Sequence, residues 1–244
     1  MSATSVLPFM STLVMLVFTV SVLQRYRARR RQHFLFWGTG LAMFGVGSFA
    51  EAYFAVAGWS APIFFGWYLF GAALNAAWLG HGTLLLLVRK RWVSILTVLL
   101  VVGSAVAAVL MLRVMPRLDA SQFDPAIPIS EQYREIMPPI SDGAAVRLST
   151  PFLNIYGLIT LVGGALWSGW LFLRKRVLPN RVIGNVLIAA GGLAIAFAST
   201  LTRLGYGQYL YLGELVAATL MYAGFVTASA PATELEAAPA ALPV

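Results

Sequence analysis

The sequence predicts an all-α integral membrane protein with seven transmembrane helices. The chain of 244 residues is 59% hydrophobic and only 11% charged, whereas a typical globular chain is about 25% charged. Its mean hydropathy is +0.80. The apolar residues fall into long runs, and each is close to the roughly 20 residues that cross the hydrocarbon core of a bilayer. A soluble helical protein would need charged residues along every helix, and these runs lack them.

The seven apolar runs predict one transmembrane domain over residues 1–230. The expected spans are residues 7–23, 34–56, 63–88, 92–115, 152–173, 182–204 and 209–228. The first run has no basic segment before it and is followed by five arginines within 25–31. We therefore expect an uncleaved first helix rather than a signal peptide.

The basic residues predict the orientation of the chain. Twelve of the 17 lysines and arginines lie in segments 25–31, 89–91 and 174–181, which fall on one side of the predicted bundle. Cytoplasmic loops carry such an excess, so we expect the N-terminus outside and the C-terminus in the cytoplasm of a multi-pass plasma (inner) membrane protein. The net charge of +8 then reflects topology, and we expect the lipid bilayer rather than nucleic acid as a partner.

Two segments lie outside the spans. The loop 116–151 contains five prolines before Pro151, and Ser130 is expected to cap a short helix over 131–137 that ends at the prolines 138–139. This loop either covers an outer vestibule or is a solvated connector. The tail 231–244 is rich in Ala and Pro and is expected to be a disordered cytoplasmic end.

A short similarity suggests an internal repeat. Gly-Leu-Ala occurs at 40–42 and again at 192–194. At this offset two helical stripes align, which are Gly40, Phe44, Gly47 and Glu51 in one span and Gly192, Ala196, Ser199 and Arg203 in the other. Spans one to three and five to seven would then be parallel repeats joined by span four, an arrangement known in transporters. The alternative is that Gly/Ala/Leu composition alone produces the match.

The first candidate site is a polar cluster near the outer face. Glu51, Arg203 and Glu214 lie at comparable depth in spans two, six and seven. Isolated charges at that depth are costly, so we expect Arg203 to pair with Glu51, Glu214 or both. The cluster is either the wall of a ligand or proton site, or an ion pair within an aromatic interface belt.

The second candidate site is in span three. Asn75, Trp78 and His81 are each three residues apart, so Trp78 neighbours both polar residues on the helix. We treat these three residues as candidates to line a pore or cavity. His81 is a candidate proton relay, metal ligand or haem ligand. The alternative is an interhelical hydrogen bond.

No cofactor, metal site or catalytic residue is predicted. A bis-histidine haem site would need His33 and His81 at similar depth, but they differ by about 10 Å. Retinal is excluded because the only lysines, Lys90 and Lys175, fall in predicted loops. The chain has no cysteine, phosphate-binding loop or HExxH motif. The sequence therefore leans away from an enzyme without deciding the question.

The layout resembles that of the SWEET sugar transporters and the PQ-loop family. The likeness rests on seven spans, an outside N-terminus, a three-plus-one-plus-three build, and prolines at the starts of spans one and five (Pro8 and Pro151). It implies a carrier. The chain has no Pro-Gln dipeptide, so no functional residue is carried over. Rhodopsin-like and receptor-like proteins share the seven-span topology.

These observations favour a small-solute carrier or ligand-binding helical bundle with a polar site between spans two, three, six and seven. One alternative is a non-catalytic accessory or sensor subunit of a larger membrane complex. A second is a haem-binding redox subunit that uses His81. The ligand and the oligomeric state are open.

Overall fold

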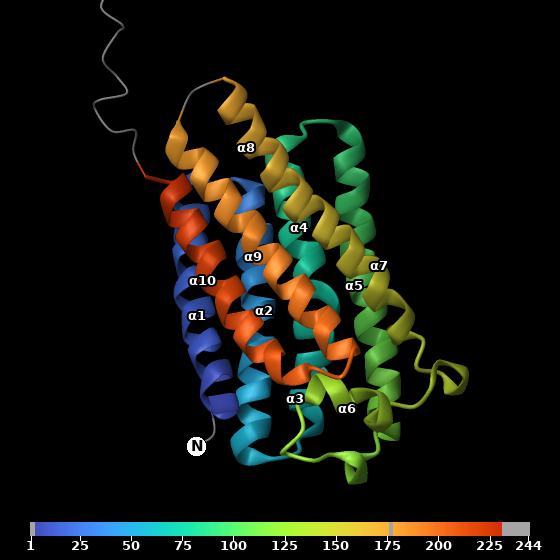
Figure 1. Cartoon of the computed structure of the whole chain (residues 1–244). Coiled ribbons are helices and arrows are strands. Elements are labelled where there is room, and N and C mark those ends of the chain that lie inside the picture. Colours follow the sequence, from blue (N-terminus) through green and yellow to red (C-terminus); the bar gives the residue numbers. More distant parts are fainter. Residues whose placement is uncertain (1–2, 176–177, 231–244) are drawn as a thin grey trace, which may run out of the picture.

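The protein is a bundle of long helices (Figure 1). The computed structural model describes residues 3–175 and 178–230, and every regular element in these ranges is helical. Seven helices are long and apolar enough to cross a membrane, namely Val6–Arg29, Gln32–Ala57, Ala61–Leu87, Arg91–Arg117, Val146–Arg174, Pro179–Arg203 and Leu210–Ala228. The predicted all-α class is confirmed, as is the prediction of seven helices long and apolar enough to cross a membrane. The predicted disordered tail, 231–244, lies outside the described residues.

Five spans are nearly uninterrupted α-helices, and two contain a π-helical segment. The five are α1 (Ala3–Arg29), α2 (Gln32–Ala57), α5 (Arg91–Val114), α9 (Pro179–Arg203) and α10 (Leu210–Ala228). Span three consists of α3 (Ala61–Gly66), the π-helix η1 (Trp67–Leu74) and α4 (Asn75–Leu87), and span five of α7 (Val146–Leu158), the π-helix η5 (Ile159–Gly163) and α8 (Gly164–Arg174). The short elements are η2 (Met115–Arg117), η3 (Ala120–Gln122), α6 (Ile129–Ile136), η4 (Ile140–Asp142) and η6 (Gly207–Tyr209).

Six spans form a closed ring, and α5 lies at its edge. Around the ring α1 packs on α2, α2 on η1 and α4, α4 on α7, η5 and α8, α8 on α9, α9 on α10, and α10 on α1. By contrast α5 has few contacts, mainly with α4, α7 and η1. Most of its large apolar side chains are exposed, as expected of a helix that faces lipid on most sides.

Glycine allows two spans to touch near one end of the bundle. A Cβ atom added to Gly47 of α2 would lie 2.6 Å from the Cα of Gly71 in η1, so the two backbones are in direct contact. The two spans are joined by a short turn and run in opposite directions. The residue one turn after Gly47, which is Glu51, therefore lies beside the residue one turn before Gly71, which is Trp67.

The segment between spans four and five packs onto the bundle instead of extending into solvent. Ile129, Ile136 and Met137 are at most 2% exposed and share a core cluster with Phe64 and Trp67 of span three. We call residues 118–145 the cap. In the predicted transmembrane layout, it covers the end of the bundle at which α2 ends and α10 begins.

A buried glutamine holds the cap in shape. Gln132 accepts a hydrogen bond from the backbone N–H of Asp124 at 2.8 Å and donates to the carbonyls of Asp124 and Ile127 at 2.8 and 2.6 Å. The prediction that Ser130 caps a helix was wrong. The helix begins at Ile129, so Ser130 lies inside its first turn, and its hydroxyl oxygen is buried without a hydrogen-bond partner.

Candidate functional site

Two glutamates from distant parts of the chain meet inside the bundle. Glu51 of α2 is 3% exposed and Glu214 of α10 is 8% exposed. Their carboxyl groups are hydrogen-bonded to each other. The structure therefore joins spans two and seven through a pair of acids.

Two other side chains donate hydrogen bonds to this acid pair. The indole Nε1 of Trp67 donates to Glu51 Oε1 at 3.1 Å, and the Ser48 hydroxyl donates to Glu214 Oε2 at 3.4 Å. Glu51 Oε2 is buried without an N–H or hydroxyl donor. An ionised carboxylate only accepts hydrogen bonds, so a hydrogen bond between two carboxyl groups requires a proton on one of them.

Arg203 does not join the pair. It is the last residue of α9 and its side chain is exposed, while the hydrogen bonds of Glu51 and Glu214 go to Trp67, Ser48 and each other. A long cationic side chain at a helix end can keep its charged head in the polar boundary, so Arg203 needs no buried counter-charge. Where an ion pair was expected, the structure has an acid–acid pair.

The cap covers the acid pair from the end of the bundle. The ring of Tyr133 on α6 lies 5.9 Å from that of Trp67 and 5.9 Å from that of Tyr68. Glu131 on the same helix packs against Gly207 just before α10, where no space remains for a side chain. Figure 1 shows α6 across the end of the bundle where α9 ends. The donor to Glu51 is therefore held under an aromatic cover.

Asn75 supports the π-helix that carries Trp67. The backbone N–H of Asn75 donates to the carbonyl of Phe70, five residues back, so it does not bond to Gly71 four residues back. The Asn75 side chain donates to this Gly71 carbonyl at 2.8 Å. Asn154 of α7 donates to the next carbonyl, that of Ala72, at 3.0 Å. A π segment displaces backbone hydrogen bonds, and these two amides satisfy carbonyls within it.

His81 lies in a separate cluster with a complete set of partners. Its imidazole is fully buried, with Nδ1 2.7 Å from the Tyr156 hydroxyl and Nε2 2.8 Å from the Thr97 hydroxyl. The Thr97 proton is directed at the carbonyl of Val93, 3.0 Å away. Nε2 of a neutral imidazole therefore donates to Thr97, and Nδ1 accepts from Tyr156. This arrangement joins α4, α5 and α7, and neither ring nitrogen is free for a metal or haem iron.

Trp78 adds a second hydrogen bond between α4 and α5. Its Nε1 donates to the Ser104 hydroxyl at 3.1 Å, and its ring stacks on Phe36 with centroids 5.0 Å apart. The structure therefore does not bring Asn75, Trp78 and His81 to one cavity with the acid pair. A groove of about 170 Å³ between α5 and α7 is lined by Leu96, Leu99, Leu100, Leu153 and Tyr156.

Sequence reasoning missed the partners of these groups. Ser48, Thr97, Asn154 and Tyr156 are ordinary polar residues of apolar spans, and their roles depend on which helix each face meets. One signal was available in the sequence. Each span next to a buried ionisable group contains a polar residue that could bond to it. The residues that the structure describes contain no group of three or more His, Asp or Glu side chains that could hold a metal ion.

Comparisons with protein-family models, with curated proteins and with solved structures give no match to this chain.

Proposed function

We propose that this polytopic membrane protein is a small-solute carrier in which the Glu51–Glu214 pair binds and releases a proton. The observation that supports the proposal is a pair of hydrogen-bonded carboxyl groups buried between two membrane-spanning helices. Acidic residues within membrane spans are costly and mark proton relays and substrate pathways in pumps and transporters.

The pair couples proton binding to the distance between α2 and α10. With one proton, the two carboxyl groups share a hydrogen bond. When that proton leaves, two negative charges face each other in an apolar surrounding, and like charges at this range repel strongly. Loss of the proton therefore favours separation of α2 from α10. That movement opens space between spans two, three, six and seven, where we place the solute.

The proposed repeat gives this movement a direction. Spans one to three contain Glu51 and spans five to seven contain Glu214, so separation of the pair rocks one three-helix unit against the other. The few contacts of α5 fit a connector between the units. The cap, which rests on Trp67 through Tyr133, is then an outer gate, with the N-terminus outside and the C-terminus in the cytoplasm of the plasma membrane.

Two observations favour a different role. The saturated hydrogen bonds around His81 and the packed cap also suit a rigid accessory or sensor subunit of a larger membrane complex. A haem-binding redox role would require His81 to give up Tyr156 or Thr97, so it ranks last.

Proton-linked uptake into vesicles tests the carrier. The purified protein is reconstituted into neutral-lipid vesicles that contain a pH-sensitive dye, and sugars, amino acids, organic acids and organic cations are added in turn. We expect one solute class to drive proton movement in the wild type, with the movement lost in Glu51→Gln and Glu214→Gln. Asp119→Asn, which alters an exposed cap carboxylate, is the matched control. Solute movement that survives both glutamine substitutions, or no movement with any class, contradicts the proposal.

A further inference from the structure

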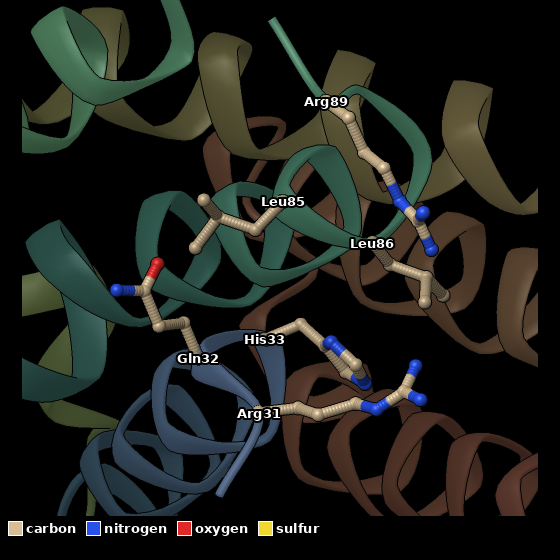
Figure 2. Close-up of a pocket in the computed structure, with 6 residues that line it drawn as sticks. All are labelled: Arg31, Gln32, His33, Leu85, Leu86 and Arg89. Carbon is tan, nitrogen blue, oxygen red and sulfur yellow. The ribbon is translucent and has the colours of Figure 1, made fainter. Parts of the chain in front are cut away.

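A basic pocket lies at the opposite end of α2 from Glu51. It has a volume of about 240 Å³ and opens to the surface between the start of α2 and the end of α4. Figure 2 shows its lining residues, which are Arg31, Gln32, His33, Leu85, Leu86 and Arg89. The pocket is nearly a full span away from the acid pair, so it is independent of the proposed proton site.

The positive charge of this pocket is not neutralised by its own lining. Arg31 and Arg89 are exposed, and Figure 2 shows both side chains extending toward the same side of the pocket as the imidazole of His33. The acidic residues of the described chain all lie between positions 51 and 214, and none lines the pocket. Two guanidinium groups therefore face an opening without a carboxylate.

His33 is largely buried, and among the described residues no side chain or backbone group bonds to its ring nitrogens. Its side chain is 8% exposed, packs against Phe34 and Trp37 with ring centroids 4.2 and 5.1 Å away, and lines the pocket. The hydrogen bonds among the described residues include none to its imidazole. Buried polar groups in native proteins normally have a partner. The ring nitrogens are not among the sealed, unpartnered atoms of the described residues, so they face the pocket, where water or a ligand is their partner.

The backbone at the start of α2 is a further source of donors. α2 begins beside the pocket, and its N-cap residue Arg31 makes no side-chain capping hydrogen bond. The first amide N–H groups of a helix have no partner inside the helix, and the helix dipole favours negative charge there. The N-terminus of α2 and the imidazole therefore point to the same kind of ligand as the two arginines.

We infer that this pocket binds a phosphate group. Guanidinium groups form paired, charge-assisted hydrogen bonds with phosphate, a helix N-terminus is a ready anion site, and His33 supplies one more donor. Leu85 and Leu86 border the same pocket, which lets an acyl chain lie against them. The phosphate belongs either to an anionic lipid headgroup or to a soluble phosphate.

Lipid retention tests the first source. Full-length protein in nanodiscs of phosphatidylcholine with a minor share of phosphatidylglycerol is released into the gas phase, and the retained phosphatidylglycerol is counted by native mass spectrometry. We expect Arg31→Gln/Arg89→Gln to reduce retention about tenfold, as loss of charged hydrogen bonds implies. The double variant Arg27→Gln/Arg29→Gln removes the same charge at the same end outside the pocket and should retain the lipid.

Thermal unfolding tests the second source. In nanodiscs of phosphatidylcholine alone, the melting temperature is compared in inorganic phosphate and in chloride at equal ionic strength. A soluble ligand raises the melting temperature of the wild type in phosphate but not that of Arg31→Gln/Arg89→Gln, whereas a lipid site responds only to phosphatidylglycerol. His33→Leu should weaken whichever response is seen.

Two results would overturn the inference. One is an equal loss of binding in the pocket variant and in Arg27→Gln/Arg29→Gln, which would show general surface attraction. The other is no response of the wild type to either probe. Equal melting temperatures of all variants in neutral lipid and chloride establish that the substitutions leave the fold intact.

Discussion

Two buried clusters of titratable residues differ in whether their hydrogen bonds are complete. Around His81, a neutral imidazole, a tyrosine and a threonine satisfy one another with no added proton. The Glu51–Glu214 pair needs a proton to form its central hydrogen bond, and Glu51 Oε2 has no other donor. Burial alone therefore does not mark a functional residue in this bundle. A missing partner is the better indicator, because the missing group must come from water, a ligand or a proton.

The largest effect is expected from a substitution that disrupts the contact between α2 and η1 beside the acid pair. Gly47→Leu places a side chain against the backbone of Gly71 and should separate α2 from η1, with a loss of about 3 kcal/mol in the free energy of unfolding. Glu51 would then lose Trp67. The control is Gly103→Leu on α5, where an added Cβ atom meets no atom within 4 Å. Thermal unfolding in neutral nanodiscs measures both, and equal stability would disprove the backbone contact.

The second effect concerns the His81 cluster, whose hydrogen bonds are complete. His81→Leu should lower the free energy of unfolding by about 2 kcal/mol because Tyr156 and Thr97 lose their shared partner. His81→Gln, whose amide can both donate and accept, should recover part of the loss. Because the folded imidazole is neutral while an unfolded histidine binds a proton at about pH 6.5, both losses should be smaller at pH 6 than at pH 8 in denaturant titrations. Equal losses at the two pH values would show that His81 binds a proton in the folded protein as readily as in the unfolded chain, and the contrast with the glutamates would fail.

The third effect is a dependence of the free energy of unfolding on pH. The folded pair holds a proton that the same glutamates release in the unfolded chain near neutral pH, where an exposed glutamate titrates at about 4.3. The folded state then binds more protons than the unfolded state, so stability falls as pH rises, by up to about 1.4 kcal/mol per pH unit. In Glu51→Gln the amide donates to Glu214 without a proton, and the slope should flatten. If the melting temperature of Glu51→Gln depends on pH as strongly as that of the wild type, the proton is held by another group.

The smallest effect has the opposite sign and serves as a reference. The Ser121 hydroxyl, the Ser121 backbone N–H and Gln122 hold the pKa of the exposed Asp119 carboxyl below its usual range. A carboxyl whose folded pKa is lowered contributes stability above its unfolded pKa, and this is lost as pH falls through the folded value. Ser121→Ala should move the pKa of Asp119 back toward its usual range. A titration of the Asp119 carboxyl followed by NMR checks this, and no movement would contradict the hydrogen bonds.

The sequence predicted the long apolar helices, and it missed how they are rotated. Hydropathy is a property of a whole run of residues, so seven runs translate directly into seven helices. Rotation depends on which neighbour each face meets. For this reason Asn154 and Tyr156 could be seen as polar residues, whereas their bonds to Ala72 and His81 could not be inferred. Arg203 was misplaced because its depth was inferred without the reach of its side chain.

The π-helix η1 was the feature least visible in the sequence. The residues 67–74 read as an ordinary apolar stretch, and the signal for the irregularity is Asn75, which was interpreted as a cavity residue. The amide was singled out correctly as unusual in an apolar span. Its role is to replace a backbone hydrogen bond within its own helix.

The same π-helix determines which way the side chains at the two ends of span three point. In an α-helix each residue turns the chain by a fixed angle, and a π segment, with its five-residue hydrogen bonds, turns less per residue. The eight residues of η1 therefore offset Trp67 from His81 around the helix axis, so that the indole meets Glu51 while the imidazole meets α5 and α7. Removing one residue from η1 would restore regular winding and turn one of these two groups away from its partners. A single span thus serves two unrelated clusters through one irregularity in its winding.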